Sequence, residues 1–318
     1  MSDCYVICIP IYNDWDSAKE VVARLHEQAR NNQRVFRFVL VDDGSTETLP
    51  LKDWTECKLS NITILRLRRN LGHQRSIAIG LAYIYRSIAC RGVVVMDGDG
   101  EDDPNDVEQL LKTMEQGGNQ RTVFAKRMKR TESMVFRLFY FLFRLIHYGL
   151  IGRKVEVGNF SCLPKIQLTR LVVVSELWNH YAAAVVKAKL PRILLPIARG
   201  RRIHGQSKMN FVSLVMHGLS AISVFSDEII VRMLVALSSL FSLLAVIFLG
   251  LLVSQPFAGS ALWIRNEMFT ILLLLLFSLL STFAFALIIL QSRNLSSFVP
   301  LRDYEVFILE TEEIGNAA

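Results

Sequence analysis

Residues 93–104 read VVVMDGDGEDDP, a short apolar run that leads directly into a cluster of carboxylates. Four apolar residues in a row indicate a buried strand, which ends where the acidic loop begins. Asp97 and Asp99 flank Gly98, so their carboxylates can converge on one hard cation and leave room for phosphate oxygens. Mg²⁺ and Mn²⁺ prefer such oxygen donors, and Glu101 offers a third carboxylate. The loop therefore predicts a site for Mg²⁺ or Mn²⁺, with a solvated turn as the alternative.

Apolar runs and amphipathic stretches alternate on both sides of this loop. The predicted strands cover residues 5–11, 35–41, 62–67 and 93–96, and the predicted helices cover residues 17–30, 74–89 and 105–116. This alternation is typical of an α/β domain with a mostly parallel sheet and helices on both faces. Ligands of such sheets bind beyond the carboxyl ends of the strands. The acidic loop occupies such a position.

A second acidic turn, residues 42–45 with the sequence DDGS, follows the predicted strand 35–41. Asp42 can accept hydrogen bonds from a ribose hydroxyl or a base N–H, although an ordinary Asx turn has the same composition. The sequence contains neither GxxxxGK[ST] nor GxGxxG after a strand, which excludes the usual phosphate cradles of P-loop enzymes and dinucleotide dehydrogenases. The five cysteines show no CxxC or metal-ligand spacing, which favours a reduced, cytosolic setting.

The chain is unusually apolar, with 52% hydrophobic residues among 318 and a mean hydropathy of +0.33. The excess lies in two uncharged runs, residues 233–253 and 268–290. Because about 20 apolar residues cross a bilayer, each run is long enough to span one. The pattern predicts a transmembrane hairpin; a buried helical pair in a soluble core is the alternative.

The charge distribution predicts how this hairpin is oriented. Residues 121–208 contain 18 basic and 3 acidic residues, a net charge of +15, whereas the loop between the two runs contains a single basic residue, Arg265. Basic residues stay on the cytoplasmic side of a membrane, so we expect both chain ends to be cytoplasmic in an inner (plasma) membrane protein. Anionic lipid headgroups are the expected partner of the basic block, in preference to nucleic acid.

Four segments follow from these features. We expect a cytoplasmic domain over residues 1–207, an amphipathic juxtamembrane helix over 208–228, the hairpin over 229–291 and a cytoplasmic tail over 292–318.

Six motifs, taken in chain order, resemble those of the family-2 glycosyltransferases with the GT-A fold. They are IPIYN at residues 9–13, VDDGS at 41–45, RNLGHQ at 69–74, MDGDGEDDP at 96–104, GNFSCL at 158–163 and RIHGQSK at 202–208. Their order, together with the terminal hairpin, is similar to the branch that glycosylates polyprenyl phosphates, which includes dolichol-phosphate-mannose synthase and bactoprenol-phosphate glucosyltransferases.

The resemblance implies an inverting, metal-dependent transfer of a sugar from a nucleoside diphosphate donor, with a UDP-sugar favoured, to a polyprenyl phosphate. It implies that Asp99 binds the metal with help from Asp97 and Glu101, and that cations neutralise the phosphates. The implied cationic residues are Arg127, Arg130 and Lys208. The implied donor contacts are Pro10, Tyr12, Asn13, Asp42, Asn70, Gly72, Asp97, Gly98, Arg202 and Ser207.

Two departures from the family pattern bear on the acceptor. Asn159 stands where many members have Asp, and Glu101 stands where many have Gln. A neutral amide cannot act as a base, and a phosphate acceptor hardly needs one because it is already an oxyanion. Asn159 therefore favours a lipid phosphate, while Glu176 is the leading spare carboxylate if a base is required.

Two alternatives remain open at this stage. A related transferase could glycosylate a glycan or lipid hydroxyl, and a non-catalytic membrane scaffold could retain a degenerate transferase domain. A processive polysaccharide synthase is disfavoured, because the sequence lacks a QxxRW motif. Assembly into a homo-oligomer is a further open expectation.

Overall fold

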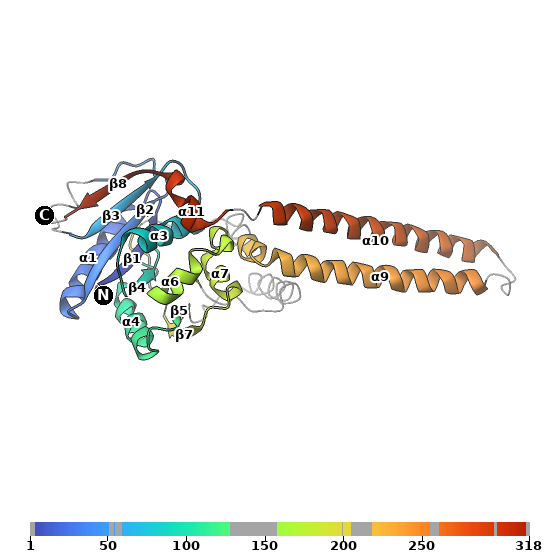
Figure 1. Cartoon of the computed structure of the whole chain (residues 1–318), viewed down its shortest axis with the longest axis horizontal. Coiled ribbons are helices and arrows are strands. Elements are labelled where there is room, and N and C mark those ends of the chain that lie inside the picture. Colours follow the sequence, from blue (N-terminus) through green and yellow to red (C-terminus); the bar gives the residue numbers. More distant parts are fainter. Residues whose placement is uncertain are drawn as a thin grey trace. The chain divides into compact units, whose positions relative to one another are not determined.

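The computed structural model describes residues 4–50, 54, 59–127, 158–198, 200–204, 218–254, 261–295 and 298–315. These residues form two compact units. The larger contains the described residues up to Val224 and residues 298–315, and the smaller contains the described residues from Phe225 to Leu295. Figure 1 labels the elements of both units.

The larger unit is built on an eight-stranded sheet with the order β7-β5-β6-β4-β1-β2-β3-β8. Its strands are β1 (Cys4–Ile11), β2 (Val35–Asp42), β3 (Ile62–Leu67), β4 (Gly92–Val95), β5 (Thr122–Arg127), β6 (Ser161–Pro164), β7 (Arg192–Ile197) and β8 (Ile308–Ile314). The central strands β1 to β4 pair in parallel, β6 runs antiparallel between β4 and β5, and β8 runs antiparallel to β3. The prediction of a mostly parallel α/β sheet is confirmed.

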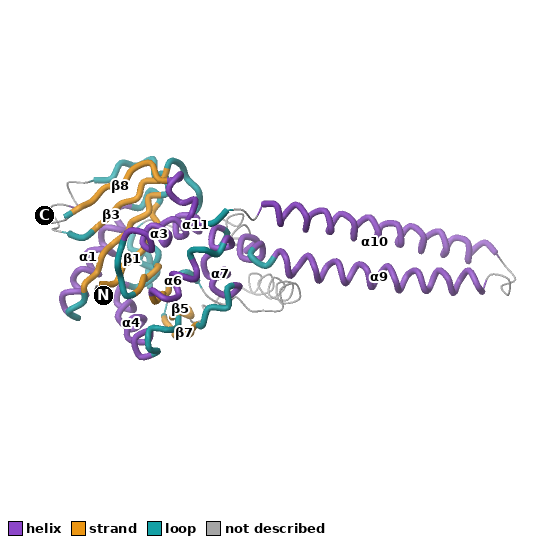
Figure 2. Tube along the Cα trace, in the orientation of Figure 1, coloured by secondary structure: helices purple, strands orange, loops and turns teal. Residues whose placement is uncertain are grey.

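Helices cover both faces of this sheet (Figure 2). They are α1 (Trp15–Asn31), α3 (His73–Ser87), α4 (Val107–Gln116), α6 (Lys165–Leu171), α7 (Tyr181–Lys187) and α11 (Pro300–Asp303), with 3-10 turns η1 (Pro104–Asp106), η2 (Ser175–Trp178) and η4 (Tyr304–Phe307). Alternate side chains of β1 point to opposite faces. Ile7 and Ile9 belong to the core that includes α1 and α4, whereas Val6 and Cys8 belong to the core that includes α3, α6 and α7.

Helix α3 packs directly on the middle of the sheet. A Cβ atom on Gly80 would lie 2.6 Å from Sγ of Cys8 and 2.9 Å from Cγ2 of Val41, so a larger residue would push the helix away from β1 and β2. This close packing fixes the first turn of α3, which begins at His73 beside the carboxyl ends of these strands.

The segment predicted as a cytoplasmic tail, residues 292–318, contains a strand that the sequence did not indicate. Strand β8 completes the sheet beside β3, and Arg66 holds it through ion pairs to Glu310 at 3.1 Å and Glu312 at 3.0 Å. The chain therefore returns to the larger unit after the second long helix. The predicted segment boundaries stay predictions, and most of residues 208–228 lie outside the described residues.

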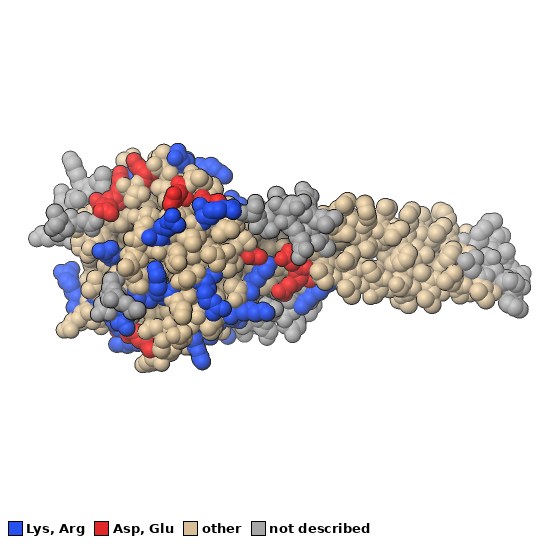
Figure 3. All heavy atoms as spheres, in the orientation of Figure 1, with Lys and Arg blue, Asp and Glu red and all other residues tan. Residues whose placement is uncertain are grey.

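The smaller unit contains two long helices, α9 (Ser226–Ser254) and α10 (Ala261–Leu295), which lie side by side (Figure 2). Ser278 Oγ donates a hydrogen bond to the carbonyl oxygen of Leu237 at 3.1 Å. Residues 226–250 and 266–288 are long and apolar enough to cross a membrane. On the face shown in Figure 3, the described part of both helices carries almost no charged side chains.

A partly buried ion-pair cluster ties β1 and β2 to α4 at the opposite end of the sheet from the acidic loops. Arg34 contacts Glu115 at 2.6 Å and Glu108 at 3.1 Å, and Tyr5 OH donates to Glu115 Oε1 at 2.6 Å. The hydrogen bond from Arg34, helped by that from Tyr5, lowers the pKa of Glu115 to about 2 from an ordinary value of 4.5.

We predict that Glu115→Gln lowers the free energy of unfolding of the detergent-solubilised protein at pH 7 by on the order of 1–3 kcal/mol. Because the pKa of Glu115 is depressed by folding, its contribution is complete above pH 4.5 and is lost as the pH falls toward 2. Melting curves at pH 7, 5 and 4 should show that the difference in melting temperature between wild type and variant becomes smaller below about pH 4.5. Glu20→Gln is the matched control, because Glu20 pairs with Arg24 on the exposed surface. The prediction would be wrong if Glu115→Gln melted at the wild-type temperature at pH 7, or if Glu115→Gln and Glu20→Gln lowered the melting temperature equally.

Candidate active site

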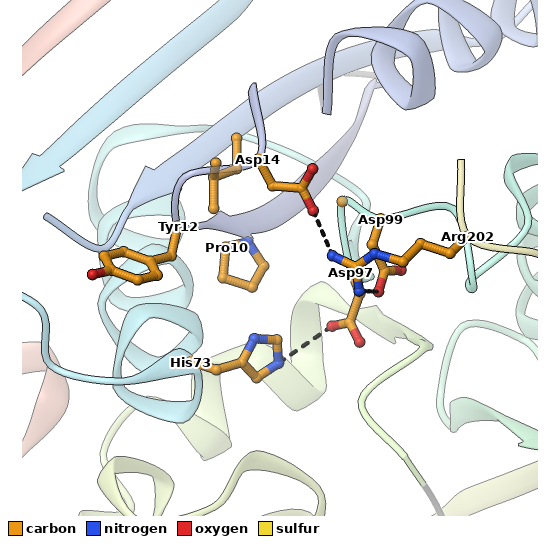
Figure 4. Close-up of a pocket in the computed structure, with 9 residues that line it drawn as sticks. Pro10, Tyr12, Asp14, His73, Asp97, Asp99 and Arg202 are labelled. Atoms are coloured by element: carbon orange, nitrogen blue, oxygen red, sulfur yellow. Dashed lines mark hydrogen bonds and ion pairs between the residues drawn. The ribbon is translucent and has the colours of Figure 1, made fainter. Parts of the chain in front are cut away.

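A pocket of about 160 Å³ lies at the carboxyl edge of the sheet, between the loops that follow β1 and β4. Its lining residues are Pro10, Ile11, Tyr12, Asp14, His73, Asp97, Gly98, Asp99 and Arg202. Figure 4 shows three carboxylates, one imidazole and one guanidinium facing one another across it. The two acidic residues of the DxD motif therefore lie in a pocket, as expected for a ligand site at this edge.

Arg202 bridges two carboxylates that come from different loops. Its Nη1 donates to Asp99 Oδ2 at 3.0 Å and its Nη2 donates to Asp14 Oδ2 at 2.8 Å. All three side chains are at most a quarter exposed, so these charges are poorly screened by water. Asp14 was not identified from the sequence, because nothing local to residue 14 reveals a partner 188 residues away.

The segment around Arg202 is anchored on the acidic loop. The backbone N–H of Gly200 donates to the carbonyl of Glu101, and that of Ile203 donates to the carbonyl of Asp99, both at 2.9 Å. Gly100 has a φ of +84°, and a Cβ there would lie 2.5 Å from Cγ1 of Ile203. Glycine is needed at this position, because both the backbone conformation and the close contact exclude a side chain.

The acidic loop is held in shape by its own carboxylates. Asp102 is buried and accepts a hydrogen bond from the backbone N–H of Asp97 at 3.0 Å, and Asp99 Oδ1 accepts one from the N–H of Glu101 at 2.9 Å. Asp102 is thus a structural member of the motif that the sequence analysis did not single out.

The donor set of the pocket fits a hard divalent cation that shares its coordination with substrate. Asp97 and Asp99 both line the pocket, whereas Glu101 is not among the lining residues. Within the described ranges, no three His, Cys, Asp or Glu side chains are close enough together to hold a metal ion by themselves. Mg²⁺ typically takes one or two carboxylates and completes its shell with water and phosphate oxygens. Two pocket carboxylates match that requirement.

The two aspartates of the second acidic turn make different contacts. Asp42 accepts a hydrogen bond from the N–H of Ser45, three residues further on, at 2.9 Å, so its side chain holds its own turn in shape. Asp43 instead reaches the start of α3, where its two oxygens accept from the N–H groups of Leu71 at 2.7 Å and Gly72 at 2.9 Å. Burial raises the pKa of Asp43, and these two backbone hydrogen bonds oppose that shift. Asp43 therefore positions the first turn of α3, a role that the sequence did not reveal.

Several predicted donor contacts lie next to the pocket without lining it. Asn13 joins the loops after β1 and β2, since its Oδ1 accepts from the N–H groups of Thr46 at 2.8 Å and Glu47 at 3.1 Å. Asp42 is the last residue of β2, and Asn70 and Gly72 lie in the segment that leads into α3. Pro10, Tyr12, Asp97, Gly98 and Arg202 do line the pocket. The assignment of all these residues to donor binding stays a prediction.

The predicted phosphate-binding cations are described only in part. Arg127 is the last residue of β5. Strands β4 and β5 both run antiparallel to β6, so β4 and β5 point in the same direction and their carboxyl ends lie at the same edge of the sheet. Arg127 is therefore at the edge where Asp97 follows β4. Arg130, Ser207 and Lys208 lie outside the described residues.

Asn159 contacts the pocket indirectly. Its Oδ1 accepts a hydrogen bond from Nε2 of Gln74 at 3.2 Å, and its Nδ2 lies 2.9 Å from Nε2 of His73. Glu176, the spare carboxylate of the sequence analysis, is paired with Lys187 at 2.7 Å and is not among the pocket residues. Burial raises the pKa of Glu176, but the hydrogen bond from Lys187 lowers it overall. Glu176 therefore has a structural partner.

Solved structures share the fold of this chain at low sequence identity. Mannosyl-3-phosphoglycerate synthase from Rubrobacter xylanophilus aligns with a TM-score of 0.50 and 13% identity, over 70% of this chain and 72% of that one. Glucosyl-3-phosphoglycerate synthase from Mycobacterium tuberculosis, crystallised with Mn²⁺, UDP-glucose and phosphoglyceric acid, aligns with a TM-score of 0.52 and 12% identity, over 71% and 80%. These GT-A structures confirm the predicted fold class.

Curated relatives align over most of their length. An undecaprenyl-phosphate 4-deoxy-4-formamido-L-arabinose transferase of Edwardsiella ictaluri is 23% identical over 83% of this chain and 81% of the relative. An uncharacterised glycosyltransferase of Synechocystis is 26% identical over 78% and 77%. Residues 6–166, half of the chain, match the family described as glycosyl transferase family 2. With the DxD pocket and the GT-A sheet, this match shows that the chain belongs to glycosyl transferase family 2.

Proposed function

We propose that the protein is an inverting, metal-dependent glycosyltransferase that moves a sugar from a nucleoside diphosphate sugar, with UDP as the favoured nucleotide, to a polyprenyl phosphate at the cytoplasmic side of the inner membrane. The observation that carries this proposal is the pocket that joins Asp97 and Asp99 with Arg202, in a chain that also has two apolar helices of membrane-spanning length. The undecaprenyl-phosphate transferases among its relatives support the choice of acceptor.

The donor would bind along the carboxyl edge of the sheet. Asp97 and Asp99 would hold Mg²⁺ or Mn²⁺, with Glu101 as the remaining candidate of the same loop. When bound, such an ion neutralises negative charge on the leaving diphosphate. Arg202 already reaches into the pocket, and its planar guanidinium suits two parallel hydrogen bonds to phosphate oxygens. Asp42 and the residues of its turn would contact the nucleoside.

The acceptor would arrive with its own nucleophile. A phosphate oxygen of the polyprenyl phosphate forms a bond to the anomeric carbon, while the bond from that carbon to the diphosphate oxygen breaks on the opposite face. This displacement inverts the anomeric configuration. Because the attacking oxygen is already anionic, no side chain needs to remove a proton, and the neutral Asn159 at this side is compatible with the reaction. Arg127, Arg130 and Lys208 would hold the acceptor and donor phosphates.

The membrane supplies the lipid end of the acceptor. Side chains such as Val235 (60% exposed) and Phe277 (69% exposed) give α9 and α10 an apolar surface that suits hydrocarbon. The basic block at residues 121–208 suits anionic headgroups and, by the positive-inside rule, the cytoplasmic face.

The acceptor class is tested by offering purified protein a short-chain polyprenyl phosphate or the matching polyprenol, together with a radiolabelled nucleotide sugar. We expect labelled lipid only with the phosphate. Arg127→Ala and Lys208→Ala should each lower the rate by roughly 10- to 100-fold, because each removes a charged hydrogen bond worth about 1.5–3 kcal/mol. Arg24→Ala is the matched control, since Arg24 is an exposed residue of α1. Equal transfer to the alcohol, or to a glycan hydroxyl without lipid phosphate, would refute the proposed acceptor.

The orientation is tested by cysteine labelling. Ser260→Cys, between the two helices, should react with a membrane-impermeant maleimide added outside spheroplasts, whereas Asn316→Cys should react only after lysis. Native cysteines set the background. Among the described ones, Cys4, Cys8 and Cys162 are buried and Cys90 is half-buried, and Cys57 lies outside the described residues, so the unmodified protein is labelled in parallel. The reverse pattern would place the active site on the outer side and overturn the proposed topology.

A further inference from the structure

The imidazole of His73 has two polar neighbours at a single nitrogen. Nε2 lies 2.9 Å from Nδ2 of Asn159 and 3.2 Å from Oδ1 of Asp97. In a neutral imidazole this nitrogen either carries a proton and donates or carries a lone pair and accepts. If it donates, its partner is the Asp97 carboxylate; if it accepts, its partner is the amide of Asn159. The two arrangements give Asp97 different charge environments.

The direction of the neighbouring hydrogen bonds selects one arrangement. The backbone N–H of Tyr181 can only donate, and it donates to Gln74 Oε1 at 2.8 Å. The other end of the Gln74 side chain is therefore its NH₂ group, which donates to Asn159 Oδ1 at 3.2 Å. Asn159 in turn presents its own NH₂ group to His73. Nε2 of His73 must then accept, and the proton of the neutral ring lies on Nδ1.

The chain of hydrogen bonds runs from the buried start of α7 to the partly exposed Asn159 and to His73, whose side chain is 39% exposed. Gln74 is 9% exposed and Tyr181 is fully buried. Ser161 Oγ donates to the carbonyl of Asn159 at 2.9 Å and lies 2.7 Å from the hydroxyl of Tyr181. Asn159 is thus tied to α7 through both its backbone and its side chain. Turning over the Gln74 amide would set its NH₂ group against the N–H of Tyr181, and turning over the Asn159 amide would set its NH₂ group against that of Gln74, so either change would break these contacts.

We propose that Gln74 and Asn159 are positioning residues that keep Nε2 of His73 unprotonated beside Asp97. His73 then gives Asp97 no proton to share, and the lone pair of Nε2 adds to the negative potential of the pocket. This arrangement favours a cation next to Asp97. The expected effect on donor binding rests on the proposed function. The position of the proton itself does not depend on the substrate.

The wild-type protein provides the primary test. Full-length protein labelled with [¹⁵N]histidine in detergent micelles, at neutral pH and without nucleotide or metal, gives ring ¹⁵N signals that distinguish protonated from unprotonated nitrogens. The signal that disappears in His73→Gln belongs to His73. We expect a proton on Nδ1 and none on Nε2. A proton on Nε2, in the neutral ring or in the imidazolium ion, would overturn the proposal.

Two variants change the chain of hydrogen bonds in different ways. Gln74→Glu still accepts from the N–H of Tyr181 but offers a second acceptor to Asn159, whose amide must turn over and present its oxygen to His73. Asn159→Leu removes the amide and leaves Asp97 as the partner of Nε2. Both changes should move a proton onto Nε2. Gln167→Glu, the same change at a buried glutamine that donates to the carbonyl of Gln120, should leave the His73 signal unchanged.

Donor affinity supplies a second readout. In both variants, nucleotide affinity with Mn²⁺ should fall about tenfold, while affinity without metal stays the same, because Asp97 now shares a proton. Either variant suffices if the other does not fold. An unchanged His73 spectrum in a folded variant would overturn the proposal. If the wild type binds no nucleotide in a metal-dependent way, the proposed function fails, whereas the spectrum still decides the position of the proton.

Discussion

The parallel pairing of β1 with both β2 and β4 is the constraint on which the site depends. Cys8 lies opposite Val95 and Pro10 lies opposite Val41, so the three strands end within a few residues of one another. The chain therefore leaves β1, β2 and β4 at one edge, and an aspartate follows the end of each strand within three residues. Asp14 and Asp97 both line the pocket for this reason, although they are 83 positions apart in the sequence.

The carboxylates at this edge repel one another, and Arg202 offsets part of that repulsion. Asp14 and Asp99 are no more than a quarter exposed, and like charges so placed repel one another strongly. The guanidinium between them offsets this repulsion and at the same time pins the segment of residues 200–204 to the DxD loop. Removing one member of such a pair would leave a poorly solvated charge behind, which costs more than the loss of an exposed ion pair. In the proposed reaction the same excess of carboxylates favours a divalent cation, and the same arginine lies beside the diphosphate.

Local patterns predicted the central sheet and the DxD pocket because both are encoded within a few residues. A four-residue apolar run followed by Asp97 and Asp99 defines a strand end and its ligand-binding loop in one stretch. Asp14 and Asp43 could not be found in this way, since their partners, Arg202 and the backbone of Leu71 and Gly72, are distant in sequence. Strand β8 was missed for a similar reason. Its sequence, ILETEEI, contains three glutamates, and two of them become compatible with a strand through Arg66 of β3.

If Asp99 holds the metal ion, nucleotide binding should depend on a divalent cation, and equilibrium binding measures that dependence. The affinity of purified full-length protein for UDP, GDP and dTDP would be measured with and without Mn²⁺. For the best nucleotide, we expect Mn²⁺ to increase affinity by at least about tenfold in the wild type and to have no effect in a folded Asp99→Asn protein. Asp103→Asn, in the same loop, should behave like the wild type, because an asparagine can still cap η1 as Asp103 does. Metal-dependent affinity that persists in Asp99→Asn would show that Asp99 does not hold the metal ion.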